Sequence, residues 1–378
     1  MTELVFVVKA SKFCNLRCLY CYEHRELHLR DRIGEATLVQ LFSGIDAFGE
    51  KLQGLGISPR FSFVWHGGEP LLLPPEFYRG VEAMQSRLIQ KFPYRNGVQT
   101  NLYRGTGESV AWCLSRGWQV GVSIDFANEV RATAGAKESN EEVLRTAESL
   151  HESGASFGVV SVLGRHNRDV LPGAYDWIER FAAGWRILPV FSGGPDESME
   201  RFALAPSEVS SVLLDLMQVR ARARRHVRID PLDDYIRSAV LKIVGEKSPG
   251  PPQRELLDNV YVVNVNGDVF TRPFAYASEY CIGNINDAGL FDLLEGEGYA
   301  RCKAAVLRRK TGNCVSCRHA GYCDTAPVHE HGSILMIDGR ERCAVPQLAI
   351  EAVEAMLRAA DVHPATIGAW AREWLEAA

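Results

Sequence analysis

The sequence has no long hydrophobic run and no strong excess of charge of either sign. No apolar stretch approaches the ~20 residues that span a membrane. The opening MTELVFVVKA is too short and too acidic for a signal peptide. The net charge of -5 and the isoelectric point near 6.1 give no reason to expect binding to nucleic acid or to an anionic membrane. We therefore expect a cytoplasmic globular protein.

Disulfide bonds are not expected, because the cytoplasm keeps thiols reduced and 378 residues bury a sufficient core without them. Ten cysteines are nevertheless present. Seven of them form two closely spaced sets: Cys14, Cys18 and Cys21, and then Cys314, Cys317, Cys323 and Cys343. Such spacing favours metal binding. Cys113 and Cys302 lie on helix-like stretches, and we expect them to be small buried apolar residues.

Short apolar runs alternate with helical patterns in the first half of the chain. The runs are LVFVV (4–8), FSFVW (61–65), GVQ (97–99), WQVGVSI (118–124), FGVVSVL (157–163) and WRILPVF (185–191). The segments between them space apolar residues at i, i+3 and i+4, as amphipathic helices do. Six β/α units in a row predict an α/β fold with a parallel sheet, open or closed as a partial barrel, over residues 1–195.

A helical bridging segment is expected next, over residues 196–250. Its two predicted helices cover about 206–226 and 231–245. The first would place three arginines on one face: Arg220, Arg224 and Arg228. This face is interpreted either as solvated or as a contact for an acidic segment of a peptide substrate.

The remaining sequence divides into a cysteine-rich region over 251–345 and C-terminal helices over 346–378. SPGPPQ (248–253) is a linker signal. VYVVNVNGDVFTRP then predicts a hairpin that turns at Asn266-Gly267.

Distinctive short motifs follow the predicted strands one after another. The first cysteine set follows the first strand, HGGEP (66–70) the second, QTN (99–101) the third, and SID (123–125) ends the fourth. Because chemistry in parallel β/α folds collects at the carboxyl ends of the strands, these motifs are expected to form one site.

Three thiols in one loop suit soft iron or zinc. A structural zinc site is closed by four ligands, and His24 is a poorly placed candidate for the fourth. Three ligands on a four-iron cluster leave one iron open, and we interpret this vacancy as the place where a small molecule chelates.

CNLRCLYC, with Tyr20 before the third cysteine, resembles the C-x3-C-x2-C signature of the radical S-adenosylmethionine (SAM) superfamily, and HGGEP strengthens the resemblance. The resemblance spans about residues 4–190. It implies a partial (β/α)6 barrel in which Cys14, Cys18 and Cys21 bind a [4Fe–4S] cluster. SAM would chelate the open iron, and its reductive cleavage would give a 5′-deoxyadenosyl radical that abstracts hydrogen.

The same resemblance assigns the SAM-binding residues. Tyr20 is the aromatic residue of the signature, and the GGE motif would hold the methionine amino group: Gly67, Gly68 and Glu69. Four further residues stand where relatives line the SAM pocket, although each could be an ordinary polar residue at a strand end: Thr100, Asn101, Ser123 and Asp125. Many relatives have glycine after the aspartate, whereas this chain has Phe126.

The second cysteine set resembles the SPASM extension of radical SAM maturases, and it implies one auxiliary [4Fe–4S] cluster. Ligands expected for a further auxiliary cluster are absent, because Arg272 and Pro327 stand where cysteines are expected and residues 251–258 contain none. A four-cysteine zinc site is the alternative. Cys281 could substitute as a ligand. His329 and His331 are interpreted as surface residues or as proton-handling groups.

This combination resembles enzymes that modify ribosomally made precursor peptides. The implied oxidoreductase reaction is hydrogen abstraction at a side-chain β-carbon followed by cross-linking to an aromatic ring, giving a cyclophane. A sulfatase-type formylglycine maturase, a peptide epimerase, and an iron–sulfur electron-transfer or scaffold protein are the alternatives. Expected partners are the precursor peptide, an electron donor such as flavodoxin or ferredoxin, and a possible separate peptide-recognition protein. The sequence identifies no general base.

Overall fold

The structure, a computed structural model, describes residues 2–190, 197–248, 259–271, 280–323, 334–337, 340–360, 366–367 and 369. Its main feature is a ten-stranded sheet in the order β10-β9-β8-β1-β2-β3-β4-β5-β6-β7. The strands of the first half are β1 (Thr2–Ser11), β2 (Pro59–Gly67), β3 (Tyr94–Thr100), β4 (Gln119–Ser123), β5 (Phe157–Leu163), β6 (Gly184–Pro189) and β7 (Ile229–Asp230). Each pairs in parallel with the next. The predicted parallel α/β fold is confirmed.

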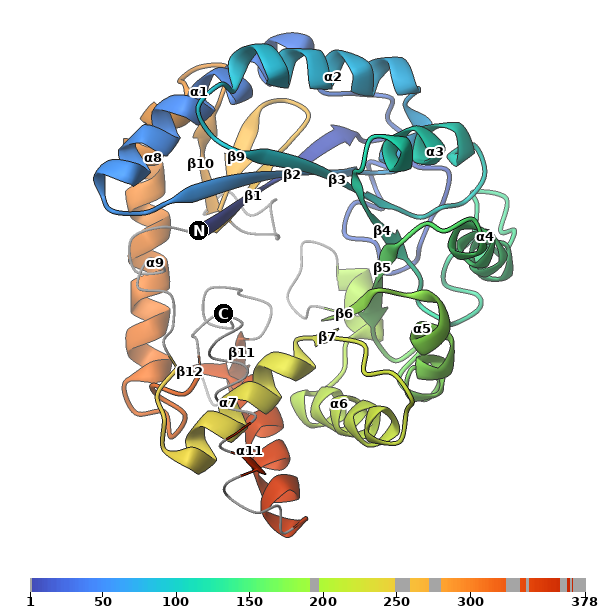
Figure 1. Ribbon diagram of the computed structural model, residues 1–378, viewed down its shortest axis with the longest axis vertical. Helices are drawn as coiled ribbons and strands as arrows, with labels where there is room; N and C mark the ends of the chain where they lie inside the picture. The colour runs from blue at the N-terminus through green and yellow to red at the C-terminus, as the bar shows by residue number, and fades with distance from the viewer. Residues whose placement is uncertain are drawn as a thin grey trace.

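Helices cover the outer side of this curved sheet (Figure 1). They are α1 (Glu35–Gly54), α2 (Pro75–Leu88), α3 (Gly107–Ser115), α4 (Asn140–Glu152), α5 (Tyr175–Phe181) and α6 (Pro206–Ala221), with short 3-10 helices η1 (Pro70–Leu72), η2 (Pro172–Ala174) and η3 (Glu197–Phe202). Alternate residues of each strand face these helices. Phe6, Phe61 and Phe63 are fully buried in this way, and Phe6 stacks on Phe63 with ring centroids 5.7 Å apart.

The prediction of a helix over 206–226 is wrong at its C-terminal end. Helix α6 stops at Ala221, so the three arginines do not form one helical face. Arg220 is largely buried and pairs with Asp233 (2.6 Å), which begins the next helix, α7 (Leu232–Val244). Arg228 instead pairs with Asp230 in β7 (2.8 Å).

The chain after the bridging segment continues the same sheet. Strand β8 (Val260–Val263) pairs in parallel with β1, and β9 (Asp268–Phe270) and β10 (Cys281–Asn284) follow antiparallel. The hairpin predicted at Asn266-Gly267 is confirmed, and Gly267 has the positive φ of +91° that favours glycine. The sheet therefore crosses the boundary that was expected at residue 251. The linker residues 249–253 lie outside the described part.

The last elements begin against β10 of the sheet and continue toward α6 and α7. They are α8 (Leu290–Glu295), α9 (Glu297–Cys314), a hairpin of β11 (Ile334–Ile337) and β12 (Arg340–Cys343), and α11 (Ala344–Ala359). Helix α11 packs against α6 and α7, and Lys242 of α7 pairs with Glu354 of α11 (2.7 Å). Figure 1 shows α9 running from the sheet toward this group of helices. Within the described residues, no helix is long and apolar enough to span a membrane.

Candidate active site

The first cysteine set lies in the loop at the carboxyl end of β1. Backbone hydrogen bonds join this loop to the connection between β4 and α4. The N–H of Arg17 donates to the carbonyl of Ala132 (2.7 Å), and that of Leu19 donates to the carbonyl of Val130 (3.0 Å). The parallel sheet therefore brings together two segments that are more than a hundred residues apart in sequence.

The three thiols are suited to a soft metal. Burial raises the pKa of Cys14 to about 12 and also raises the pKa of Cys18 and of Cys21, so the free chain carries neutral thiols that a metal must deprotonate. Two N–H groups reach the sulfur of Cys14, from the backbone of Leu16 (3.4 Å) and from the side-chain amide of Asn101 (3.5 Å). Such donors stabilise a thiolate ligand.

A single zinc ion fits this loop poorly. Nδ1 of His24, the candidate fourth ligand, lies 3.1 Å from the carbonyl oxygen of Cys18 and is engaged there. In the described ranges, no three His, Cys, Asp or Glu side chains converge on one metal ion. Thiols spread over one loop instead suit separate irons of a cluster. The residues present therefore fit a three-cysteine [4Fe–4S] site.

The GGE turn after β2 packs directly on the cysteine loop. Gly67 has a φ of +115°. A Cβ on Gly67 would lie 2.2 Å from the carbonyl oxygen of Ser11, and one on Gly68 would lie 2.3 Å from that of Lys12. The resemblance assigned both glycines to SAM binding. The structure shows that the chain's own cysteine loop already requires both glycines.

Glu69 anchors the turn to the end of β3. Its buried carboxylate accepts hydrogen bonds from the backbone of Leu71 (3.0 Å), the hydroxyl of Thr100 (2.8 Å) and the backbone of Asn101 (2.7 Å). Burial nevertheless raises the pKa of Glu69 to about 7. The predicted cofactor residues Glu69, Thr100 and Asn101 are thus brought together, and they contact one another.

Tyr20 and Asp125 also contact each other. The Tyr20 hydroxyl donates to the Asp125 carboxylate, and Arg131 donates to the same carboxylate and to the Tyr20 oxygen (both 3.2 Å). The backbone N–H of Val162 donates to the second oxygen of Asp125 (2.7 Å). All four groups belong to a buried cluster that links the cysteine loop to the ends of β4 and β5. Asp125 is completely buried, so its carboxylate acts on the loop through these contacts.

Phe126 explains the departure from the aspartate–glycine pattern. It adopts a φ of +56°, a backbone conformation that glycine accepts without strain. Its ring packs on Trp177 and Trp185, with centroids 5.5 and 5.9 Å apart, which offsets the strain. Ser123, the remaining predicted residue, accepts a hydrogen bond from Gln99 (2.9 Å).

The second cysteine set lines a cavity of about 30 Å³ between α9 and α11. Cys314 ends α9, Cys317 and Cys323 lie in the following loop, and Cys343 ends β12. Burial raises the pKa of Cys314 and of Cys343. The four thiols surround one space, and such a four-cysteine set can hold a cluster or the alternative, zinc.

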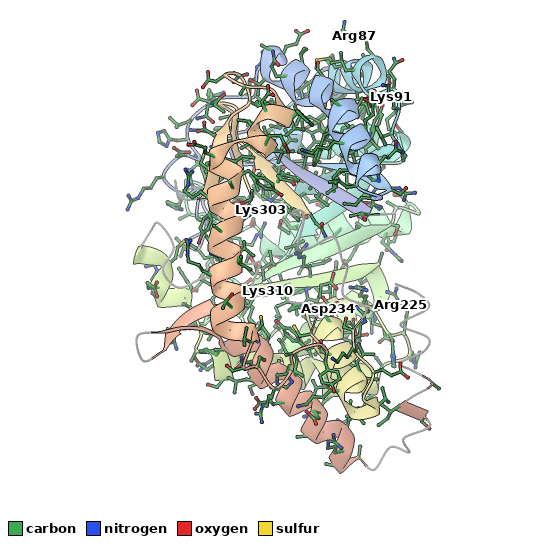
Figure 2. All side chains as sticks on the ribbon, turned by 90° about the vertical axis from the view of Figure 1, so that its left-hand side faces the viewer. Arg87, Lys91, Arg225, Asp234, Lys303 and Lys310 are labelled. Atoms are coloured by element: carbon green, nitrogen blue, oxygen red, sulfur yellow. The ribbon has the colours of Figure 1, made fainter. Side chains whose placement is uncertain are left out.

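Cys281 does not belong to the second set. Its carbonyl accepts a hydrogen bond from Arg301 near the start of α9 (2.9 Å), whereas Cys314 ends that helix. Thirteen residues at ~1.5 Å each separate the two ends by about 20 Å. Figure 2 shows the length of α9, along which Lys303 and Lys310 are labelled. The interpretation of Cys281 as a substitute ligand there is wrong. Cys113 and Cys302 are buried, as predicted, and Arg272, Pro327, His329 and His331 lie outside the described residues.

Sequence reasoning missed three features of the site. Asn15 accepts a hydrogen bond from Asn101 (2.8 Å). Its position inside the cysteine motif was the available signal. Lys9 forms a buried ion pair with Glu23, and the available signal was a lysine directly after the apolar run LVFVV. Burial lowers the pKa of Lys9. No local pattern marks Arg131, because its partners come from distant segments.

Known proteins share parts of this sequence. Residues 8–178 match the family model described as Radical SAM superfamily. The chain is 24% identical over 346 residues to the serine-type anaerobic sulfatase-maturating enzyme of Bacteroides thetaiotaomicron, which covers 85% of this chain and 81% of that protein. It is also 24% identical over 315 residues to the cysteine-type enzyme of Clostridium novyi, with coverage of 78% and 79%.

Solved structures share the fold. The structure titled "Native anSMEcpe with bound AdoMet" has a TM-score of 0.71 at 18% identity and covers 94% of this chain and 97% of its own. The structure of Streptococcus suis SuiB bound to S-adenosylmethionine has a TM-score of 0.58 at 12% identity, with coverage of 85% and 72%.

The family model matches less than half of the chain, residues 8–178, and the solved structures share the fold of most of it. Residues 8–178 form a radical SAM domain, and the protein is an enzyme. Its cofactors are therefore SAM and a [4Fe–4S] cluster.

Proposed function

We propose that this enzyme modifies a ribosomally made precursor peptide by hydrogen abstraction from the β-carbon of a side chain. The observation that carries the proposal is the presence of two separate cysteine sites, a three-thiol loop at the strand ends and a four-thiol cavity beyond α9. The substrate class is supported by the sulfatase-maturating relatives and by SuiB, whose structure is also described with its precursor peptide SuiA.

Cys14, Cys18 and Cys21 would hold the cluster that binds SAM. When bound, this pair supplies one-electron cleavage of the sulfonium and hydrogen-atom abstraction. The side chains of this protein position the cluster-binding loop. The Glu69 carboxylate anchors the GGE turn to the end of β3, and its backbone N–H donates to the carbonyl of Phe13 in the cysteine loop. Asp125 holds that loop against the ends of β4 and β5.

The four cysteines of the second set would hold an auxiliary [4Fe–4S] cluster: Cys314, Cys317, Cys323 and Cys343. All of its irons then have protein ligands, so it would supply one-electron acceptance rather than SAM binding. An electron donor such as flavodoxin or ferredoxin and a separate peptide-recognition protein would complete the proposed system.

Cross-linking of the β-carbon to an aromatic ring is the product that we propose. It is supported by Arg272 and Pro327, which stand where sulfatase-type maturases are expected to have ligands of a further auxiliary cluster. Formylglycine formation is the second candidate, and the similarity to sulfatase-maturating enzymes across 81% of one relative favours it. Both reactions begin at a β-carbon, so the first step is common to them.

Co-expression with a short peptide encoded beside the gene, followed by mass spectrometry, tests the proposal. Cross-linking predicts that the peptide loses the mass of two hydrogen atoms, resists fragmentation between the joined residues, and does not react with a hydroxylamine probe. A product captured by that probe is an aldehyde and supports formylglycine formation. An unchanged mass with deuterium incorporated at an α-carbon indicates epimerisation. A peptide that is untouched while SAM is cleaved contradicts the pairing.

A further inference from the structure

Helix α9 exposes one of its faces to solvent over most of its length. Its other side packs against β10, α8 and β12. Residues spaced three, four or seven apart lie on the same face of a helix. The exposed residues that share this spacing form what we call the α9 face: Arg301, Ala304, Leu307, Arg308, Thr311 and Val315. At ~1.5 Å per residue the face is about 20 Å long, and it ends at the second cysteine set.

Two large apolar side chains lie on the α9 face. Leu307 is 63% exposed and Val315 is 80% exposed. Val315 stands between Cys314 and Cys317 in the sequence, so this apolar part adjoins the second site. Exposed apolar side chains that are surrounded by polar residues mark places where another molecule docks. The α9 face therefore has the composition of an interaction surface next to the cavity of the second site.

The charged residues of α9 after its first residue are all basic. Residues 298–314 contain five Lys or Arg and no Asp or Glu. Arg301 and Arg308 belong to the face, and Figure 2 shows Lys303 and Lys310 along the same helix. The whole chain, in contrast, has a net charge of -5. A basic surface on an acidic protein selects an acidic partner and steers it to that place.

We propose that the α9 face is the docking surface for an acidic one-electron carrier protein of the flavodoxin or ferredoxin class. The inference rests on the auxiliary cluster of the proposed function. Cross-linking leaves one electron on that cluster. The oxidised carrier takes this electron, so the cluster is reoxidised while the carrier is reduced by one electron.

The position of the face favours such a carrier over an acidic peptide. Its apolar part adjoins Cys314 and Cys317, whereas the peptide reacts at the carboxyl ends of the strands. Electron-transfer partners also bind through small interfaces, for which one helix face is sufficient. A carrier docked on Leu307 and Val315 therefore lies next to the cluster that it oxidises.

Electron transfer to a purified acidic flavodoxin tests the docking surface. The chain with Cys14, Cys18 and Cys21 changed to Ala keeps only the second cluster, and iron analysis confirms that this cluster is present. The protein is reduced, separated from the reductant and mixed rapidly with oxidised flavodoxin, whose absorbance reports its one-electron reduction. We expect a rate constant that falls about tenfold as the ionic strength rises, because salt screens the attraction between the basic face and the acidic carrier.

Charge reversal on the face identifies the place of docking. At low ionic strength, Arg308→Glu should lower the rate constant about tenfold and weaken the binding of flavodoxin measured by calorimetry. Leu307→Asp should do the same, because it removes an apolar contact and adds repulsion between like charges. Arg87→Glu makes the same charge change as Arg308→Glu at an exposed position on α2, near the top of the molecule in Figure 2, and should change neither quantity.

Equal rate constants and affinities for Arg308→Glu and Arg87→Glu overturn the docking surface and leave the proposed function intact. A rate constant that does not depend on salt does the same, and this measurement needs no variant of the face, so failure of Arg308→Glu to fold does not matter. Weaker binding of the precursor peptide to Arg308→Glu, with an unchanged rate of flavodoxin reduction, overturns the carrier in favour of a peptide. Absence of iron from the second site overturns the auxiliary cluster of the proposed function together with this inference.

Discussion

Gly68 lies where the turn after β2 meets the carbonyl groups of the cysteine loop. Its N–H donates to the carbonyl of Ser11 (2.8 Å), and its missing side chain leaves room for the backbone of Lys12 and Phe13. The position of the thiols thus depends on Gly68, as well as on Gly67, having no Cβ.

Gly68→Ala should push the cysteine loop away from the turn. The new Cβ would lie 2.3 Å from the carbonyl oxygen of Lys12, and backbone cannot rotate away as a side chain can. We expect a loss of about 1–3 kcal/mol in the free energy of unfolding and a lower iron content after anaerobic reconstitution. Gly80→Ala on α2 is the control, because its Cβ meets nothing within 4 Å. Equal iron contents in the two variants would contradict the account.

The raised pKa of Glu69 predicts that the stability of the protein depends on pH. Burial raises its pKa to about 7, so the folded chain binds this proton more tightly than the unfolded chain does. The corresponding stabilisation is fully present below the ordinary pKa and is lost as the pH rises through about 7. Urea unfolding should show that the stability of the wild type relative to Glu69→Gln decreases from about pH 5 to about pH 8. A difference in unfolding free energy between the wild type and Glu69→Gln that does not change with pH would contradict this prediction.

At the scale of elements, the connection between β4 and α4 fixes the cysteine loop from the outside. It supplies Arg131 beside Asp125, and both groups are buried. The sequence could place Asp125 at a strand end, because the apolar run before it predicts β4. It could not predict Arg131, because that side chain acquires its partners only when the loop folds back on Tyr20.

Asp125→Asn should destabilise the protein strongly, because it leaves the Arg131 guanidinium buried without a counter-charge. Removing one partner of a buried pair costs about 3–5 kcal/mol. The double variant Asp125→Asn/Arg131→Gln should lose less than the sum of the single variants. Thermal or urea unfolding of all three variants measures this coupling, and strictly additive losses would show that the two groups act independently.

Arg225 lies between α6 and β7, and its side chain caps the C-terminus of helix α5. Its guanidinium donates to the carbonyls of Glu179 and Ala182, both at 2.8 Å or less. Figure 2 shows Arg225 and Asp234 on the lower part of the molecule. Arg225→Ala should lower the free energy of unfolding by about 1–2 kcal/mol, since the helix loses a cation at its C-terminus. Arg224→Ala, at an exposed position, should change it by less than about 0.5 kcal/mol. Equal losses would contradict this role.

At the scale of the whole molecule, the sequence allowed the site to be located because parallel strands bring their carboxyl ends to one edge. HGGEP, QTN and the cysteine triad could be placed together for that reason. The end of α6 at Ala221 could not be predicted, because the backbone N–H of Arg225 donates to the distant carboxylate of Glu179 (2.6 Å) instead of to a helical carbonyl. The anchoring of the turn by Glu69 could not be predicted either, because the hydrogen-bond donors to its carboxylate come from β3 and from the turn itself.

The central claim is that Cys14, Cys18 and Cys21 hold the cluster at which SAM is cleaved. Iron analysis and 5′-deoxyadenosine release should be measured on the anaerobically reconstituted wild type, on the variant with these three cysteines changed to Ala, and on Cys113→Ala as the control for a buried cysteine. We predict that iron falls from about eight to about four atoms per chain in the triple variant and that 5′-deoxyadenosine release stops. Full iron content together with continued SAM cleavage in the triple variant would contradict the account.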